Sequence, residues 1–251
     1  SLSLVEEIPL PFSDTSLFYP VDYSRKYYFI LSVHSIEDSL ANSNHTEMAT
    51  TVLEEPEYCY INKVSVNDAN EIAVHVLTNS LGVHHFNIYR SSFKDGFMQE
   101  IGQVTAVGLE GVFVDKAVIP ERNIYYYSAK PVDVCGKEYT LPSYYGIIDI
   151  AKVHNLKIQP LSITSEDISV SWNEYEGFLE AALHELWLEV NDSLFSVLEI
   201  SDDSTAIVDV SDYVGSICLY VQAIEGVPNV LGRKDTVFSN KVCLNKEPIV
   251  T

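Results

Sequence analysis

Apolar and polar residues alternate over short runs along most of the chain. The run 72–76 reads Ile-Ala-Val-His-Val, and the run 86–89 reads Phe-Asn-Ile-Tyr. Because successive side chains of a strand point to opposite faces of a sheet, such alternation predicts half-buried β-strands. Gly, Pro, Asn and Asp fall between the runs, where hairpins need turns. The pattern predicts an all-β fold of antiparallel sheets.

The predicted strands fall into three groups. The first group lies in residues 1–55 and comprises only the last strands of a partial domain, at 3–8, 16–19, 27–33 and 49–53. The second spans residues 58–150, with strands at 60–66, 71–77, 85–90, 99–104, 112–115, 124–132 and 139–149. The third spans residues 152–245, with strands at 154–160, 167–172, 184–189, 196–200, 206–210, 217–224 and 236–244. Residues 246–251 are expected to begin a linker to a following domain.

A longer pattern repeats with a period of about 100 residues, marked by Ser43, Ser143 and Ser239. Each of these serines follows a long strand that is itself preceded by a short apolar run. The paired segments are 17–19 with 27–33, 112–115 with 124–129, and 206–209 with 217–223. Solenoid units are only roughly 20–50 residues long, so this period predicts tandem domains. Seven short strands in each complete unit are typical of an antiparallel sandwich.

Two local features of the third group allow different interpretations. Trp172 ends its second strand, where Val76 stands in the second group, and we interpret it as a core residue rather than a ligand platform. The window 177–188 fits an amphipathic helical turn, but its second half also fits a third strand. The repeat favours the strand.

Charge excludes several classes of function. The 251-residue chain has 15 Lys and Arg against 36 Asp and Glu, a net charge of −21. Nucleic-acid affinity depends on cations that displace phosphate counterions, so we expect neither nucleic-acid binding nor attraction to anionic membranes. No apolar run approaches the roughly 20 residues of a spanning helix, so we expect no membrane insertion. Because the chain starts at Ser1, we interpret it as an internal piece of a longer protein.

Several motifs resemble one family. The sequence reads Phe-Asn-Ile-Tyr-Arg at 86–90, Phe-Val-Asp at 113–115, Tyr-Tyr-Tyr at 125–127 and Asp-Val-Cys-Gly at 133–136. These motifs resemble the fibronectin type III-like repeats of large surface proteins that bacteria export through the type IX secretion system. The segment 239–244 is similar to the ending that precedes a gliding-motility-associated C-terminal sorting domain. The sequence departs from the family at Pro131 and at 186–188, where Leu-Trp-Leu replaces Ile-Tyr-Arg.

The resemblance implies a fold, a location and a role. The fold is a tandem array of immunoglobulin-like (fibronectin type III-like) β-sandwiches, of which the first is partial. The protein would be exported through the periplasm to the outer cell surface or the extracellular space. It would act without catalysis, in adhesion or as a spacer.

The four cysteines are the strongest candidate for chemistry. Cys59 and Cys135 belong to the second group, and Cys218 and Cys243 to the third. Four cysteines allow three connectivities, and the division into domains favours Cys59–Cys135 and Cys218–Cys243. Two disulfides would imply an oxidising compartment. Four buried free thiols remain the alternative. No Cys-x-x-Cys occurs, so we expect no zinc site.

No catalytic constellation is visible. His84 and His85 are adjacent and would point to opposite faces of a strand, so they cannot easily share a metal. Nucleophile elbows, His-Glu-x-x-His and phosphate-binding glycine loops do not occur. We therefore expect no enzyme activity and no cofactor, with calcium at a domain junction as the one exception held open. The candidate glycosylation sites are Asn44 and Asn191, in Asn-x-Ser/Thr motifs, and Ser39, Ser193 and Thr236, in Asp-Ser/Thr-apolar motifs.

Three functions remain open. The first is an extended spacer that presents an adhesive or C-terminal sorting module and contacts other domains of the same polypeptide. The second is an accessory polysaccharide-binding module of a secreted hydrolase, for which Tyr126, Tyr144 and Tyr145 would form a sugar-binding strip. The third is a component that docks onto the secretion machinery.

Overall fold

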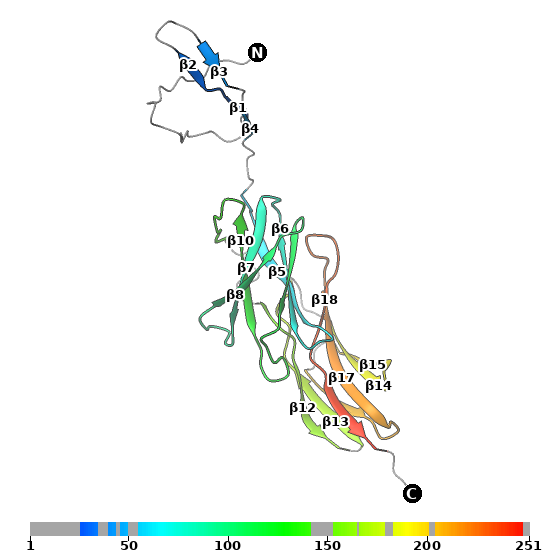
Figure 1. Ribbon diagram of the computed structural model, residues 1–251. Helices are drawn as coiled ribbons and strands as arrows, with labels where there is room; N and C mark the ends of the chain where they lie inside the picture. Colours follow the sequence, from blue (N-terminus) through cyan, green and yellow to red (C-terminus); the bar gives the residue numbers. More distant parts are fainter. Residues whose placement is uncertain are drawn as a thin grey trace. The chain divides into compact units, whose positions relative to one another are not determined.

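The computed structural model describes residues 26–34, 40–43, 46–49, 55–141, 153–164, 166–178, 183–200 and 204–247 (Figure 1). The chain divides into unit 1, residues 1–53, and unit 2, residues 54–251. Every regular element within the described ranges is a β-strand, and every pairing between them is antiparallel. The predicted all-β class is therefore confirmed.

Unit 1 contains two short hairpin ladders. β1 (Lys26–Phe29) pairs with β4 (Thr46–Ala49), and β2 (Ser32–His34) pairs with β3 (Leu40–Asn42). The strand expected at 27–33 is thus interrupted at residues 30 and 31. The Leu31 amide donates to Ser43 Oγ, and the Ser43 amide donates back to the Leu31 carbonyl, which holds the bend. The strands expected at 3–8 and 16–19 lie outside the described residues.

Unit 2 begins with a sandwich of two sheets, the second sandwich of the sequence. Its strands are β5 (Cys59–Val66), β6 (Ile72–Thr78), β7 (Val83–Ser91), β8 (Gln99–Thr105), β9 (Glu110–Asp115), β10 (Tyr126–Asp133) and β11 (Val153–His154). One sheet has the order β5-β6-β9, and the other has the order β11-β10-β7-β8. The strand expected at 139–149 lies almost wholly outside the described residues.

The third sandwich repeats this arrangement. Its strands are β12 (Ile158–Ile163), β13 (Asp167–Trp172), β14 (Leu183–Val190), β15 (Ser193–Ile200), β16 (Thr205–Asp209), β17 (Gly215–Ile224), β18 (Thr236–Phe238) and β19 (Val242–Lys246). The sheets have the orders β12-β13-β16 and β15-β14-β17-β18, with β19 also paired to β17. Both sandwiches have the strand arrangement of an immunoglobulin-like, fibronectin type III-like fold.

The structure corrects two expected elements and decides a third. The strand expected at 154–160 is two strands, because Val153 and His154 pair with β10 of the second sandwich and β12 starts the third. The strand expected at 236–244 is also split, into β18 and β19. Where a helical turn was an alternative, residues 183–190 form β14, as the repeat indicated.

The core follows the predicted alternation. Val74, Val76, Phe86 and Ile88 are fully buried, and Trp172 is a core residue as expected. The buried apolar side chains of both sandwiches form one continuous cluster rather than two separate cores. Burial of each such side chain stabilises the fold by about 1.5–3 kcal/mol. The two sandwiches therefore share part of their hydrophobic stabilisation.

One buried polar network distinguishes the second sandwich from the third. Asp115 accepts hydrogen bonds from Arg90 Nη1 at 2.6 Å and from Tyr127 Oη at 3.0 Å. Burial and the Asp115 charge raise the pKa of Tyr127 well above its ordinary value. The repeat aligned Asp115 with Asp209, but this equivalence is wrong. Asp115 lies opposite Ile72, whereas Asp209 lies opposite Asp167 and is exposed.

The cysteines bear out one of the two expected bonds. Cys218 and Cys243 lie directly opposite each other on β17 and β19 and form a disulfide with a Cα–Cα distance of 4.1 Å. The expected Cys59–Cys135 bond is not formed, and both thiols are free. Cys59 lies at the start of β5 and is buried enough to raise its pKa, whereas Cys135 lies in an exposed turn after β10. The two side chains therefore belong to different sheets and different environments.

Reduction of the Cys218–Cys243 bond is expected to destabilise the third sandwich by about 3 kcal/mol. The bond closes a loop in the unfolded chain, and its reduction frees that loop and so raises the conformational entropy of the unfolded state. Urea unfolding of the chain with and without a phosphine reductant measures the difference. The Cys135→Ser variant is the control, since it removes an unbonded thiol and should respond to reductant as the unaltered chain does. An unfolding midpoint that does not move on reduction would contradict the expectation.

Candidate functional site: the junction of the two sandwiches

The connection between the sandwiches is short and buried. His154, Asn155 and Leu156 join β11 to β12, and all three are almost fully buried. Asn155 Oδ1 accepts a hydrogen bond from the Tyr125 amide at 2.7 Å, which ties the connection to the second sandwich. Lys157 donates its amide to Asn173 Oδ1 at 2.6 Å, which ties it to the third. The connection therefore has no free hinge residue among 153–158.

The segment after β13 closes one side of the junction. Tyr175 is buried, and its hydroxyl accepts a hydrogen bond from the Val64 amide of β5 at 2.8 Å. Its ring packs edge-on against Phe178, with ring centroids 4.8 Å apart. A side chain at Gly177 would lie 2.6 Å from the Tyr175 ring, so only glycine allows this close approach. β5 is an edge strand, and this contact uses one of its outward backbone donors.

Residues 225–235, which connect β17 to β18, form the other side and are called the junction loop below. Figure 1 shows this loop running alongside the second sandwich, near β6. Its tip is a turn in which the Asn229 side chain accepts a hydrogen bond from the Leu231 amide and Gly232 adopts a φ of 73°. Glycine takes a positive φ without steric cost, which permits the reversal. The loop is thus a folded arm rather than an irregular connection.

Asp235 is the centre of the junction. Its carboxylate is buried and accepts hydrogen bonds from Asn62 Nδ2 at 2.7 Å, Lys63 Nζ at 3.1 Å and Asn229 Nδ2 at 2.5 Å. Burial on its own would raise the pKa of Asp235, but the hydrogen bonds from Lys63 and Asn62 outweigh it and lower the pKa. The ionised carboxylate therefore joins one strand of the second sandwich to one loop of the third.

Two further contacts extend this interface. Arg233 Nη2 donates to Glu110 Oε2 at 3.1 Å, at the start of β9. The Phe238 amide of β18 donates to Ser65 Oγ on β5 at 2.9 Å. Lys94 and Glu176 form an ion pair at 2.8 Å, but both are exposed, so their contribution is small. The junction loop and β18 thus lie across the outward face of the sheet β5-β6-β9.

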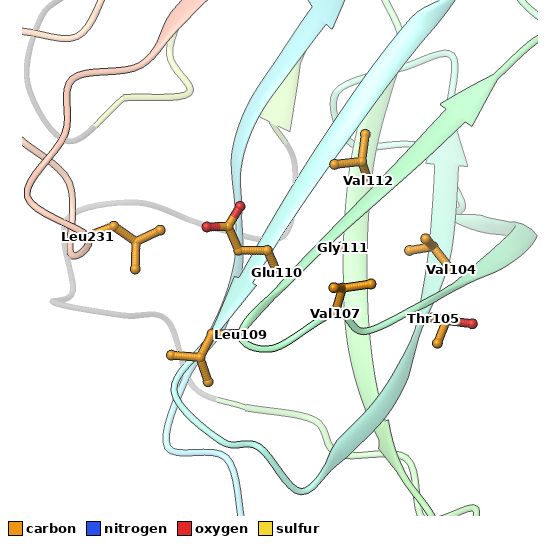
Figure 2. A pocket seen from close by; sticks show the side chains of 8 residues that line it. All are labelled: Val104, Thr105, Val107, Leu109, Glu110, Gly111, Val112 and Leu231. Atoms are coloured by element: carbon orange, nitrogen blue, oxygen red, sulfur yellow. The ribbon is translucent and has the colours of Figure 1, made fainter.

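An open apolar groove borders the junction loop (Figure 2). It has a volume of about 610 Å³. Figure 2 shows Leu231 on the loop side and the other lining side chains on the second sandwich. The lining residues are Val104, Thr105, Val107, Leu109, Glu110, Gly111, Val112 and Leu231. Glu110 is their one ionisable member and is paired with Arg233.

The outward face of the third sandwich has an aromatic row. Trp187 on β14 and Tyr220 on β17 are register partners, with ring centroids 6.5 Å apart and ring planes within 8° of parallel. Phe238 lies 6.3 Å from Tyr220 by ring centroids. Lys241 Nζ stands over the Tyr220 ring and is paired with Glu189. This row crosses three strands and stabilises the sheet through cross-strand contacts.

The predicted modification sites lie in different environments. Asn191 is the first residue of the β14–β15 hairpin turn, with Asn191 at φ 47° and Asp192 at φ 66°. Its amide side chain donates to the Val214 carbonyl and accepts from the Ser216 amide, so it is already part of the fold. Ser193 is exposed, whereas Thr236 is half-buried in β18 beside β5. Ser39 and Asn44 lie outside the described residues.

The other candidates do not gather into a site. His84 is exposed beside half-buried His85. Tyr126 packs against His154 at the junction, and Tyr144 and Tyr145 lie outside the described residues, so the sugar-binding strip stays a prediction. Within the described ranges, no three His, Cys, Asp or Glu side chains form a group suited to a metal ion. Calcium at a junction stays a prediction.

The junction residues give no signal in the alternation of apolar and polar residues. Tyr175, Asn229 and Asp235 lie in loops, where a period of two gives no information. One signal was present: residues 225–235 form a long connection between β17 and β18. Loops that exceed the usual two to five residues of a hairpin often serve a binding role. Their length alone does not reveal what they bind.

Comparisons with known proteins give structural likeness only. No family model and no curated protein matches the sequence. Among solved structures, the chain is similar to a tetra-tandem repeat from the extending region of a large adhesion protein, with 10% identity and a TM-score of 0.32 over 89% of this chain. It spans 57% of that protein's length. It is also similar to the FN1–FN3 domains of chicken CNTN1, with 11% identity and a TM-score of 0.28, covering 90% of this chain and 79% of that one. In the described part of the chain, no helix is long and apolar enough to cross a membrane.

Asp235→Ala is expected to uncouple the sandwiches. It removes a charged acceptor that takes three hydrogen bonds and leaves Lys63 without its partner, which should cost about 3 kcal/mol of coupling free energy. Pulse-labelling hydrogen exchange along a urea gradient follows β6 and β13 separately. In the unaltered chain both should unfold at one midpoint, and in the variant the two midpoints should separate. Asp212→Ala, at an exposed loop of the third sandwich, is the control. Coincident midpoints in both variants would contradict the role of Asp235.

Proposed function

We propose that this chain is a structural spacer of an exported bacterial surface protein, and that it holds an adhesive or sorting module in a fixed orientation. The observation that carries the proposal is the junction: a buried connection, the Tyr175 contact and the Asp235 hydrogen bonds together lock two sandwiches into one compact unit. A chain that only linked two domains would not need to bury a carboxylate between them. A fixed orientation is useful to a protein that positions something else.

Three other features support a role outside the cell and without catalysis. The Cys218–Cys243 disulfide suits an oxidising compartment. The net charge of −21 favours solubility and repulsion between neighbouring molecules. The buried carboxylates Asp115 and Asp235 are paired within the fold with Arg90 and Lys63, respectively. The resemblance of the sequence motifs to type IX-exported repeats supports a bacterial cell-surface location, reached through the periplasm.

The spacer proposal predicts a narrow distance distribution between the two sandwiches. A spin label on the exposed native Cys135 reports the second sandwich, and one on Asp212→Cys reports the third. Cys59 is buried with a raised pKa and should resist labelling. Pulsed dipolar spectroscopy of the 251-residue chain should give one narrow peak. The same pair in an Asp235→Ala background should give a broad distribution. A broad distribution in the unaltered junction would remove the basis of the proposal.

A second candidate function, polysaccharide binding, is favoured by one observation. The aromatic row Trp187, Tyr220 and Phe238 lies on an outward face, with the polar side chains of Glu185 and Gln222 next to it. Aromatic rings beside hydrogen-bonding groups fit the apolar faces and hydroxyls of sugars. Lys241 and Glu189 already cover part of Tyr220, however, and for this reason the spacer comes first.

Affinity electrophoresis in gels with soluble polysaccharides tests the second candidate. If the row binds sugar, the chain should migrate more slowly in one such gel, and Trp187→Ala should restore normal migration. Ile207→Ala is the matched control, because Ile207 is an exposed apolar residue on the other sheet of the same sandwich. Unretarded migration with every polysaccharide would contradict the second candidate.

A further inference from the structure

His75 lies beneath the junction loop. It is on β6, between Lys63 on β5 and Val112 on β9, on the face opposite to the fully buried Val74 and Val76. This outward face is the one that the junction loop covers, because Asp235 and Arg233 of the loop bond to Lys63 and Glu110 at its two edges. An outward-facing histidine is consequently half-buried in the interface rather than solvated.

The charged groups around His75 come from every element packed against it. Lys63 and Arg233 are cations and oppose a charged imidazole, whereas Asp235 and Glu110 are anions and favour one. Both anions are already bonded to these cations. Two cations and two anions thus surround His75, and a proton on its ring would add a third positive charge to them. Burial is the largest effect on His75, and with the charges of Lys63 and Arg233 it lowers the pKa of His75 from 6.5 to about 4.

We propose that the junction is acid-sensitive: it is closed while His75 is neutral, and protonation of His75 opens it without unfolding either sandwich. The proposal rests on the proposed function, because it assumes the locked junction. Opening would exchange the fixed orientation of the two sandwiches for a hinged one at low pH. Opening removes the cover of the junction loop from His75, whereas Lys63 on β5 stays beside it and continues to oppose its charge.

The direction follows from proton linkage. In the closed form the pKa of His75 is about 4, and in the open form the solvated side chain returns to about 6.5. The open form therefore binds the proton more tightly, and the population of the closed form decreases as the pH falls from 6.5 towards 4. Between pH 7.5 and pH 4.5 these two values correspond to a shift of at most about 70-fold in the opening equilibrium.

His154, the other buried histidine of the junction, is a weaker candidate. Burial lowers its pKa, while a hydrogen bond to the Asn155 carbonyl raises it. Glu176 Oε2 lies 3.9 Å from its Nε2, so this carboxylate can compensate the positive charge of a protonated His154. Protonation of His154 would thus cost the closed junction less than protonation of His75.

The Val64 amide is a specific reporter of opening, because it donates to Tyr175 Oη across the junction. Its hydrogen exchange, corrected for intrinsic rate, measures the opening equilibrium of the full chain at pH 7.5 and pH 4.5. We expect its protection to fall by up to about 70-fold at pH 4.5 in the unaltered chain. His75→Gln, and His75→Asn as a second neutral replacement, should limit the fall to about 3-fold or less. The Val74 amide, in the central strand of the sheet, should keep its protection throughout.

His84→Gln is the matched control, because His84 is an exposed histidine of the same sandwich, and it should keep the full response. Equal protection of Val64 at both pH values, or an unchanged fall in both His75 variants, would overturn the acid-sensitivity proposal alone. A Val64 amide unprotected already at pH 7.5 would overturn the locked junction and the proposed function with it. Loss of Val74 protection at pH 4.5 would also overturn the inference, because it would indicate unfolding of the sandwich rather than opening.

Discussion

A buried carboxylate placed between two domains is the constraint on which unit 2 depends. Removing Asp235 from water is unfavourable unless its oxygens are satisfied, and they are satisfied only when β5 of one sandwich meets the junction loop of the other. The same geometry aligns the Tyr175 hydroxyl with the Val64 amide. Apolar packing of the junction is not directional, but these hydrogen bonds are. They select one orientation out of the many that the apolar surfaces would tolerate.

Two copies of one architecture have diverged at the junction and within their cores. The second sandwich buries Asp115 with Arg90 and Tyr127, whereas the corresponding position of β16 is occupied by the apolar Val208. The third sandwich carries the cross-strand disulfide and the long junction loop instead. A polar network in one copy and a covalent bond in the other thus reinforce similar sheets by different chemistry.

The strands could be predicted from the sequence because their burial alternates with a period of two. β13 matches its expected range of 167–172 fully, and β6 and β7 differ only at their ends. The period could not locate the breaks at residues 155–157 and 239–241, because polar residues also occur on the outward face of a strand. Asp115 and Asp209 are not equivalent, because the place of a residue in a sheet depends on its pairing partner. The two segments are offset by one residue, and the sequence pattern alone does not show this offset.

The cross-strand disulfide has a mechanical consequence. β19 is the last described strand, and it is held to β17 by a ladder of hydrogen bonds that includes the Cys218–Cys243 pair. Tension applied beyond residue 247 would reach Cys243 after stretching only the outermost rungs of this ladder. From there a covalent bond would carry the load straight into β17, which is paired on both sides in the middle of its sheet. Separation of β19 from β17 would stop at Cys243, and the applied force would then act as shear on the whole sandwich.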